Sequence, residues 1–227
     1  VSPTEVNGYQ TVRGGGNEGG PYTVYFHAIF DTRPKSCGTW KDSDIKAEKG
    51  TDNSTGVYGA FDVSPGQVVK VKVGISFSSA EKARQNITRE LSGWNWTAAR
   101  DAALEIWDRN LSRILVDGAT RKQKELIYTA FYHSLFCPTD RTGENPDWSS
   151  SAPYYDDYYA IWDTYRTLHP LLTLIHTSRQ IEFVQSLIDI YKHRGWMPDA
   201  ASGNDTGMTQ GGSNCDIVIA DAFVKNL

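Results

Sequence analysis

The sequence predicts an α+β chain in two parts, an incomplete antiparallel β-sandwich followed by a helical region. Up to about residue 78 the hydrophobic residues recur with a period of two, the spacing of a half-buried strand. After Ser78 the period changes to 3.6, which is typical of amphipathic helices. Turn residues separate the strand-like runs, as at 49–56 and 64–66, and this favours antiparallel connections.

The clearest strand predictions cover residues 22–30 and 69–77. In the second, Val71, Val73 and Ile75 alternate with lysines, and we interpret Lys70 and Lys72 as the solvent face of the sheet. With only four or five strands in this region, the sandwich is expected to be incomplete.

The helical region begins with two predicted helices. Thr97 is a candidate N-cap of the first, which carries an apolar stripe of Ala98, Ala102, Leu104, Trp107, Leu111 and Ile114. Of these, Trp107 is predicted to be a core residue. Thr120 and Gln123 have the spacing of a capping box for the second helix, which must end before Pro138.

Further helices are predicted over about 159–175 and 178–194, and a last one begins near 214–216. Gly195 stands where a C-terminal cap residue belongs, since glycine tolerates the left-handed conformation that ends many helices. Successive helices joined by loops favour an α/α arrangement. Because the chain opens on Val1 and stops at Leu227 directly after a helical pattern, we expect it to be a piece of a longer protein.

Composition excludes several classes of partner. Lys and Arg number 23 against 27 Asp and Glu, a net charge of −4, so no cationic surface for nucleic acid is expected. The apolar runs are far shorter than the ~20 residues that span a bilayer. Three scattered cysteines predict neither a disulfide scaffold nor a zinc site.

Acceptor sites for N-linked glycans favour a secreted glycoprotein. Five Asn-x-Ser/Thr sequons occur, at Asn53, Asn86, Asn95, Asn110 and Asn204. Asn110 lies inside a predicted helix and is the least suited to modification. We therefore expect the protein to enter the secretory pathway, although no signal peptide is visible in the chain.

The densest chemical signal is the segment 158–170, in which a helix would place Trp162 and Arg166 on one face and Asp163 beside them. An indole, a carboxylate and a guanidinium together suit a sugar, since the ring stacks on the aromatic face and the hydroxyls bond the charged groups. The alternative is a core Trp beside a surface Asp–Arg pair. The spacing alone leaves both interpretations open.

A second cluster spans residues 195–214 and is rich in Gly, Asn, Ser and Thr. Such a loop between helices suits a polar binding rim, although most loops only connect elements. Both interpretations stay open on these residues alone.

Collinear motifs through almost the whole chain resemble glycoside hydrolase family 92, the calcium-dependent exo-acting α-mannosidases, and its fungal branch most. The most specific stretch is Trp162-Asp-Thr-Tyr-Arg166 with His169-Pro-Leu-Leu-Thr-Leu174. The other matching stretches are 71–86, 93–94, 107–114, 128–135, 195–198, 210–214 and 219–222.

The resemblance implies a β-sandwich joined by linker helices to an (α/α)6 barrel, with the active site between the domains. On this basis residues 1–78 form the end of the sandwich domain, 79–118 a helical linker, and 119–227 the opening helices of the barrel. The family's catalytic acid and base lie beyond the position that matches Leu227. We therefore assign no catalytic residue here and expect the 227 residues alone to be inactive.

The resemblance also implies an activity: removal of terminal mannose, of the α-1,2 type, from N-glycans and other mannosides with inversion. A Ca²⁺ ion that bridges two mannose hydroxyls is expected, with ligands that we cannot assign and that lie mostly outside this chain. The expected partners are mannose-containing glycans. A non-catalytic carbohydrate-binding protein that uses the same aromatic-rich face is the alternative.

The resemblance implies substrate-binding residues in this chain only at positions that match the family's motif. Trp162, Asp163 and Arg166 are the expected contacts to the terminal mannose, and His169 is expected to support them. Asn204 and Asp205 complete the set, although they depart from the Gly-Asn-Glu-Thr run of many bacterial members.

Overall fold

The computed structural model describes residues 4–12, 21–41, 43–46, 55–203 and 212–227. The chain divides into two compact units. The first holds Val1–Val12 and Thr23–Trp96, and the second holds Arg13–Tyr22 and Thr97–Leu227. The combination of a strand-rich region followed by a helical one confirms the mixed class predicted from the change of period.

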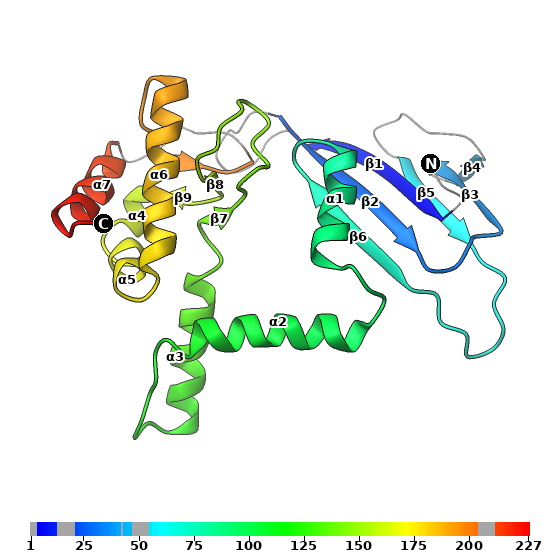
Figure 1. Cartoon of the computed structure of the whole chain (residues 1–227), viewed down its shortest axis with the longest axis horizontal. Helices are drawn as coiled ribbons and strands as arrows, with labels where there is room; N and C mark the ends of the chain where they lie inside the picture. The colour runs from blue at the N-terminus through cyan, green and yellow to red at the C-terminus, as the bar shows by residue number, and fades with distance from the viewer. Residues whose placement is uncertain (1–3, 13–20, 42, 47–54, 204–211) are drawn as a thin grey trace. The chain divides into compact units, whose positions relative to one another are not determined.

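The first unit contains two three-stranded sheets (Figure 1). One has the order β1 (Glu5–Val12), β2 (Tyr22–Phe30), β6 (Val71–Ser76), and β2 pairs with β6 antiparallel. The other has the order β4 (Asp44–Lys46), β3 (Ser36–Lys41), β5 (Thr55–Ala60), with both neighbours antiparallel to β3. The two strands predicted most clearly, over 22–30 and 69–77, are confirmed as β2 and β6.

The predicted solvent face of β6 is wrong. Helix α1 (Ala80–Glu90) packs on the side that carries Lys72 and Gly74, while Val71, Val73 and Ile75 are 53–55% exposed (Figure 1). Gly74 makes the close approach possible, because a Cβ there would lie 2.3 Å from the Ala83 carbonyl oxygen. Alternation identifies the apolar face of a strand but not which face a neighbouring helix covers.

The second unit is built from helices and short two-stranded ladders. Its helices are α2 (Trp96–Leu111), α3 (Arg121–Ser134), α4 (Ile161–Thr164), α5 (Leu168–Ile175), α6 (Thr177–Arg194) and α7 (Asn214–Val224). The ladders join β7 (Thr139–Asp140) to β8 (Tyr155–Asp156) and β9 (Tyr159–Ala160) to β10 (Ala200–Ala201). None of the described helices is long and apolar enough to cross a membrane.

Local capping signals are confirmed at two helices. The Thr120 hydroxyl accepts a hydrogen bond from the Gln123 backbone, and the Gln123 side chain accepts one from the Thr120 backbone, which closes the capping box of α3. Gly195 ends α6 in the left-handed conformation, with φ +80°. The predicted cap at Thr97 is wrong, since α2 begins one residue earlier and Thr97 lies inside it.

The predicted helix over 159–175 is also wrong, because it is two helices with a turn between them. The first, α4, ends at Thr164, and α5 begins at Leu168. Pro170 is the third residue of α5 and has no N–H to donate to the carbonyl of Arg166, so a continuous helix would lack that bond. Arg166 therefore lies in the turn rather than one helical turn after Trp162.

Two clusters of buried side chains form the core of the second unit. One includes Phe131, Leu135 and Leu172, and Trp107 packs against it with its ring 4.4 Å from that of Tyr132. The predicted core role of Trp107 is thus confirmed. Leu111 and Ile114 of the predicted stripe pack against the same cluster. Ala98, Ala102 and Leu104 do not, and Leu104 is 56% exposed.

Candidate sugar-binding site

The segment that carries the predicted sugar contacts is a tight turn fixed by backbone pairing. Strand β9 pairs antiparallel with β10, so that Ala160 lies opposite Ala200. The next amide, that of Ile161, donates to the Asp199 carbonyl at 2.8 Å, and α4 begins at that residue. The pairing therefore sets where α4 starts and which way its side chains point.

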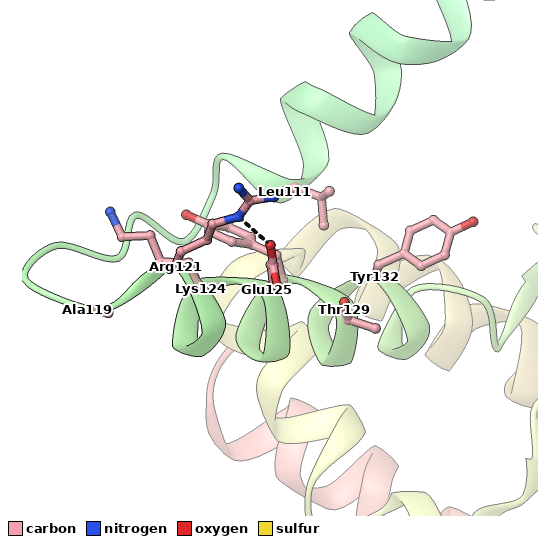
Figure 2. A pocket seen from close by; sticks show the side chains of 8 residues that line it. Leu111, Ala119, Arg121, Lys124, Glu125, Thr129 and Tyr132 are labelled. Carbon is pink, nitrogen blue, oxygen red and sulfur yellow. Dashed lines mark hydrogen bonds and ion pairs between the residues drawn. The ribbon is translucent and has the colours of Figure 1, made fainter.

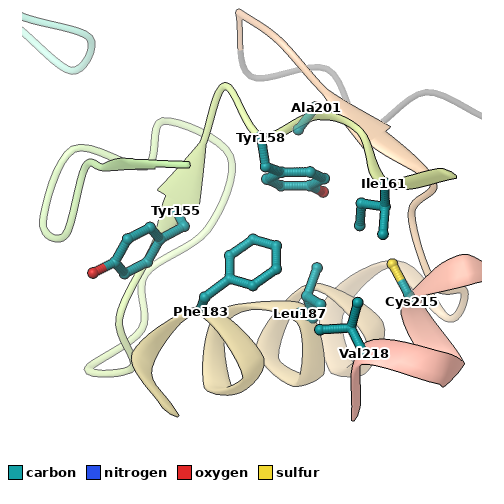
Figure 3. Packing of buried hydrophobic residues seen from close by; sticks show 8 residues of the cluster. All are labelled: Tyr155, Tyr158, Ile161, Phe183, Leu187, Ala201, Cys215 and Val218. Atoms are coloured by element: carbon teal, nitrogen blue, oxygen red, sulfur yellow. The ribbon is translucent and has the colours of Figure 1, made fainter. Parts of the chain in front are cut away.

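A cluster of buried hydrophobic side chains packs beneath this segment and fixes its position. Tyr158 and Ile161 are at most 1% exposed and point toward Phe183 and Leu187 of α6 (Figure 3). Residues Tyr155, Ala201, Cys215 and Val218 complete the cluster. Because interiors of this kind are close-packed, the backbone of this segment is rigidly positioned.

The three residues predicted to contact the sugar are exposed side chains of this segment. Trp162 is 43% exposed, and Asp163 and Arg166 are exposed. The Arg166 Nε donates to the Tyr165 hydroxyl, and its guanidinium carbon lies 4.9 Å from the centre of the Tyr165 ring. Within the described part of the chain no ion pair joins Asp163 to Arg166, so the surface-pair alternative has no geometric support.

His169, unlike these three residues, is buried. Its side chain is 2% exposed, its ring stacks on Phe183 with 4.7 Å between centres, and its Nδ1 lies 3.2 Å from the Gln180 Oε1. Burial lowers the pKa of His169 to about 4, although the bond to Gln180 acts in the opposite direction. His169 is therefore neutral at pH 7 and joins α5 to α6 behind the turn, which suits a supporting role rather than direct contact.

The second predicted cluster divides into two. Asn204 and Asp205 lie outside the described residues, and their predicted role stays a prediction. Within the described part, residues 198–201 pack inward, since Pro198 is fully buried and Asp199 is 7% exposed, whereas Gly195, Gly212 and Ser213 are exposed. The thiol of Cys215 donates to the Pro198 carbonyl, which ties this segment to α7.

A groove of about 750 Å³ lies elsewhere in the same unit, along α3. It is lined by Leu111, Ala119, Arg121, Lys124, Glu125, Tyr128, Thr129 and Tyr132 (Figure 2). The Arg121 Nε and the Glu125 Oε1 pair at 2.7 Å, and the Tyr128 hydroxyl donates to the Ile114 carbonyl at 2.8 Å. None of the predicted site residues lines this groove.

The described residues do not by themselves form a metal site. Among them, no three side chains of His, Cys, Asp or Glu gather closely enough to hold an ion. Calcium needs six to eight oxygen ligands, so Asp163 could supply at most a small part of such a shell. The binding of Ca²⁺ by the full-length protein stays a prediction.

Trp162, Asp163 and Arg166 offer an indole, a carboxylate and a guanidinium, groups that suit sugar binding rather than proton transfer. A carboxylate accepts hydrogen bonds from hydroxyls, a guanidinium donates them, and an indole stacks on the C–H surface of a pyranose ring. Hydrolysis in addition requires a pair of carboxyl groups across the scissile bond, which these three residues alone do not provide.

Comparison with known proteins decides the family. The profile of the glycosyl hydrolase family 92 N-terminal domain matches residues 1–76, and that of the family's catalytic domain matches residues 82–227. The chain belongs to glycosyl hydrolase family 92. The resemblance predicted from the collinear motifs is confirmed.

Individual relatives in family 92 are much longer than this chain. An uncharacterized secreted glycosidase of Arthroderma benhamiae is 31% identical over 210 residues, which are 90% of this chain and 23% of that protein. A family 92 inverting mannosidase of Bacteroides thetaiotaomicron superposes with a TM-score of 0.81 at 25% identity, covering 99% of this chain and 32% of that one. A family 92 alpha-mannosidase of the same bacterium, solved with mannoimidazole, gives 0.84 at 25% identity, with 100% and 32% covered.

Two contacts made by the predicted site residues are not predicted by the sequence. Tyr165 holds the Arg166 guanidinium, and an aromatic residue next to an arginine was the available signal. Phe183 and Gln180 hold His169 from a different helix, and no local pattern links residues that lie 11 or 14 positions apart. The substrate roles of Trp162, Asp163, Arg166 and His169 stay predictions.

Proposed function

We propose that this chain is part of an inverting exo-α-mannosidase that removes terminal α-1,2-linked mannose from N-glycans and related mannosides. Membership of family 92 supports a glycoside hydrolase, and the solved relatives described as an inverting mannosidase and an alpha-mannosidase support the substrate. The mannoimidazole complex of one relative supports recognition of a mannose-like ring. The observation that carries the proposal is the match of residues 82–227 to the family's catalytic domain, together with the exposure of Trp162, Asp163 and Arg166 next to a buried core.

In this proposal the chain binds the sugar, and carboxyl groups elsewhere in the full-length protein cleave the bond. Asp163 accepts hydrogen bonds from neighbouring hydroxyls, Arg166 donates to an oxygen, and Trp162 covers one face of the ring. An inverting enzyme needs an acid and a base ~6.5–9.5 Å apart, with room for water. We assign neither to this chain and propose that the 227 residues alone are inactive.

The proposal extends to the architecture. We propose that the two sheets of the first unit belong to a β-sandwich domain. The helices of the second unit are, in this proposal, a linker and the opening of an (α/α)6 barrel. The large exposed side chains on β6 and α7, such as Val73 at 54% and Phe223 at 78%, support contact with further protein.

Calcium is a separate part of the proposal. The described residues give it no ligand set, so the ion would be held by other residues of the full-length protein. Dialysis against EDTA should abolish mannose release, and added Ca²⁺ should restore it. Full activity after thorough chelation would contradict the proposed role of calcium but not the proposed mannosidase activity.

We also propose that the protein enters the secretory pathway. The relative from Arthroderma benhamiae is described as secreted, and the chain contains five sequons for N-linked glycans. Both observations point to the same compartment.

The direct test is mannose release by the full-length protein. It should liberate mannose from α-1,2-mannobiose, measured by chromatography of the free sugar. If no α-mannoside is hydrolysed but mannosides still bind, the non-catalytic carbohydrate-binding protein replaces the enzyme. Calorimetric titration with the same disaccharide separates that outcome from a protein that binds no mannoside.

A further inference from the structure

Arg166 is an exposed residue of the turn between α4 and α5 whose long side chain is restrained by its neighbour. An arginine side chain has many rotamers, and ordering it when a ligand binds costs free energy. An arginine that is already held in the free protein avoids most of this cost. The contacts that hold Arg166 therefore bear on how tightly it can bind a ligand.

Tyr165 makes both of the contacts that restrain Arg166. The Arg166 Nε donates a hydrogen bond to the Tyr165 hydroxyl. The guanidinium carbon lies 4.9 Å from the centre of the Tyr165 ring, within the ~6 Å of a cation–π contact. Arg166 makes no further hydrogen bond or ion pair with the part of the chain that the structure describes. The Tyr165 side chain is thus what restricts the guanidinium.

Tyr165 is itself anchored to the core of the second unit. Its amide donates to the Ile161 carbonyl at 2.9 Å, and the Ile161 amide donates to the Asp199 carbonyl at 2.8 Å. Ile161 is fully buried, and Tyr165 packs against the same hydrophobic cluster. Because such close-packed clusters move little, they hold the Tyr165 hydroxyl at a defined position.

The contact with Tyr165 leaves the terminal nitrogens of the guanidinium available. A guanidinium has five N–H donors, one on Nε and four on the two Nη atoms. Tyr165 uses the Nε donor, and the Nη donors bond to no other described residue. Because the guanidinium is planar and rigid, its two Nη atoms suit two neighbouring acceptor oxygens. Adjacent hydroxyls of a sugar ring provide such a pair.

A purely structural role for the Tyr165 hydroxyl is the competing interpretation. A hydroxyl that serves the fold typically bonds to backbone, as that of Tyr128 does when it donates to the Ile114 carbonyl at 2.8 Å. The Tyr165 hydroxyl differs, because among the described residues it bonds only to the Arg166 side chain. Removing this hydroxyl should therefore release Arg166 and leave the surrounding fold unchanged.

We propose that Tyr165 is a positioning residue of the sugar site, which holds the Arg166 guanidinium so that both Nη atoms donate to neighbouring oxygens of the terminal mannose. Tyr165 acts through Arg166 and does not itself bind the sugar in this role. The inference rests on the proposed function, in which Arg166 contacts the terminal mannose, and it adds to that function a residue whose hydroxyl sets how well Arg166 does so.

The test is Tyr165→Phe in the full-length protein, with Tyr128→Phe as the matched control. Each variant keeps the ring and loses one hydrogen bond, but only Tyr165→Phe frees a predicted sugar contact. From the usual net contribution of a hydrogen bond, Tyr165→Phe should lower kcat/KM for mannose release from α-1,2-mannobiose by about 2- to 12-fold. Tyr128→Phe should keep kcat/KM even if its melting temperature falls. Wild-type kcat/KM in Tyr165→Phe, or an equal fall in both variants, would contradict the positioning role.

A double-mutant cycle shows whether the effect of Tyr165 passes through Arg166. Arg166→Gln removes the guanidinium and should lower kcat/KM by about 10- to 150-fold, as expected for hydrogen bonds from a charged group. Adding Tyr165→Phe to Arg166→Gln should cause no further fall. If Tyr165→Phe had the same effect in both backgrounds, or if Arg166→Gln kept full activity, the proposal would be wrong.

The same proteins separate this inference from the proposed mannosidase activity. Mannose release by the wild type together with an unaffected Tyr165→Phe variant contradicts the positioning role alone. If the wild type binds α-1,2-mannobiose without cleaving it, the mannosidase proposal fails. Dissociation constants from calorimetric titration of the wild type, the two single variants and the double variant then replace kcat/KM in the same cycle. A wild type that neither cleaves nor binds the disaccharide contradicts both proposals.

Discussion

Asp163 offers the sharpest test of the proposed sugar site, because the structure separates its effect on folding from its effect on binding. The side chain is exposed, and no hydrogen bond or ion pair holds it within the described part of the chain. Asp163→Asn in the full-length protein should therefore change the free energy of unfolding by no more than about 0.5 kcal/mol.

The same substitution should weaken catalysis strongly. Asn keeps one acceptor oxygen but replaces the other with an NH2 group, which meets a sugar hydroxyl as a second donor. A hydrogen bond to a charged group contributes about 1.5–3 kcal/mol, so losing one should lower kcat/KM by about 10- to 150-fold.

The assay is the initial rate of mannose release from α-1,2-mannobiose, with a thermal melt of the same sample. Asp108→Asn is the matched control, since Asp108 is an exposed carboxylate on α2 and outside the predicted site. The control should keep both rate and melting temperature. A near-wild-type rate for Asp163→Asn would refute a sugar contact by Asp163, and a loss of rate with an equal loss of stability would point to a structural role instead.

Three further outcomes are expected in the full-length protein. Gly74→Ala should destabilise it by about 1–3 kcal/mol, because the new Cβ would lie 2.3 Å from the Ala83 carbonyl oxygen. An unchanged melting temperature would mean that α1 moves away from β6 without cost. Thr120→Ala should cost about 1 kcal/mol through the lost capping box, whereas Thr120→Ser should cost little in the same melts. The folded-state pKa of His169, about 4, lies below the ordinary histidine value of about 6.5. The stability that neutral His169 gives to the α5–α6 segment is therefore present above pH 6.5 and is lost as the pH falls toward 4. Between pH 7 and 5 its opening free energy from hydrogen exchange should fall by about 2 kcal/mol, and a His169→Gln variant with an equal fall would contradict this cause.

The features that could be predicted from sequence are those that depend on near neighbours. Thr120 and Gln123 form their capping box because both partners lie within one turn. Gly195 ends α6 because only its own backbone must become left-handed. The strand period of β2 and β6 is equally local. In each case the energy that fixes the structure comes from residues inside a short window.

The predictions that were wrong concern features that depend on distant contacts or on a competing local signal. The covered face of β6 follows from Gly74 admitting α1, which no alternation of residues encodes. The break between α4 and α5 has a visible local signal in Pro170, which lacks the N–H that a continuous helix would need. For the predicted site, the residue types of the motif point to Asp163, whose role stays a prediction. The stacking of Arg166 on Tyr165 and the burial of His169 depend on three-dimensional contacts that the motif does not encode.

The measurement that tests the central claim most directly is the anomeric form of the first sugar released. Proton NMR of the full-length protein acting on α-1,2-mannobiose distinguishes β-mannose from α-mannose before the two interconvert. An inverting exo-α-mannosidase must produce β-mannose first and only later the equilibrium mixture. Initial release of α-mannose would contradict the inverting mechanism, and no release of mannose would contradict the enzyme itself.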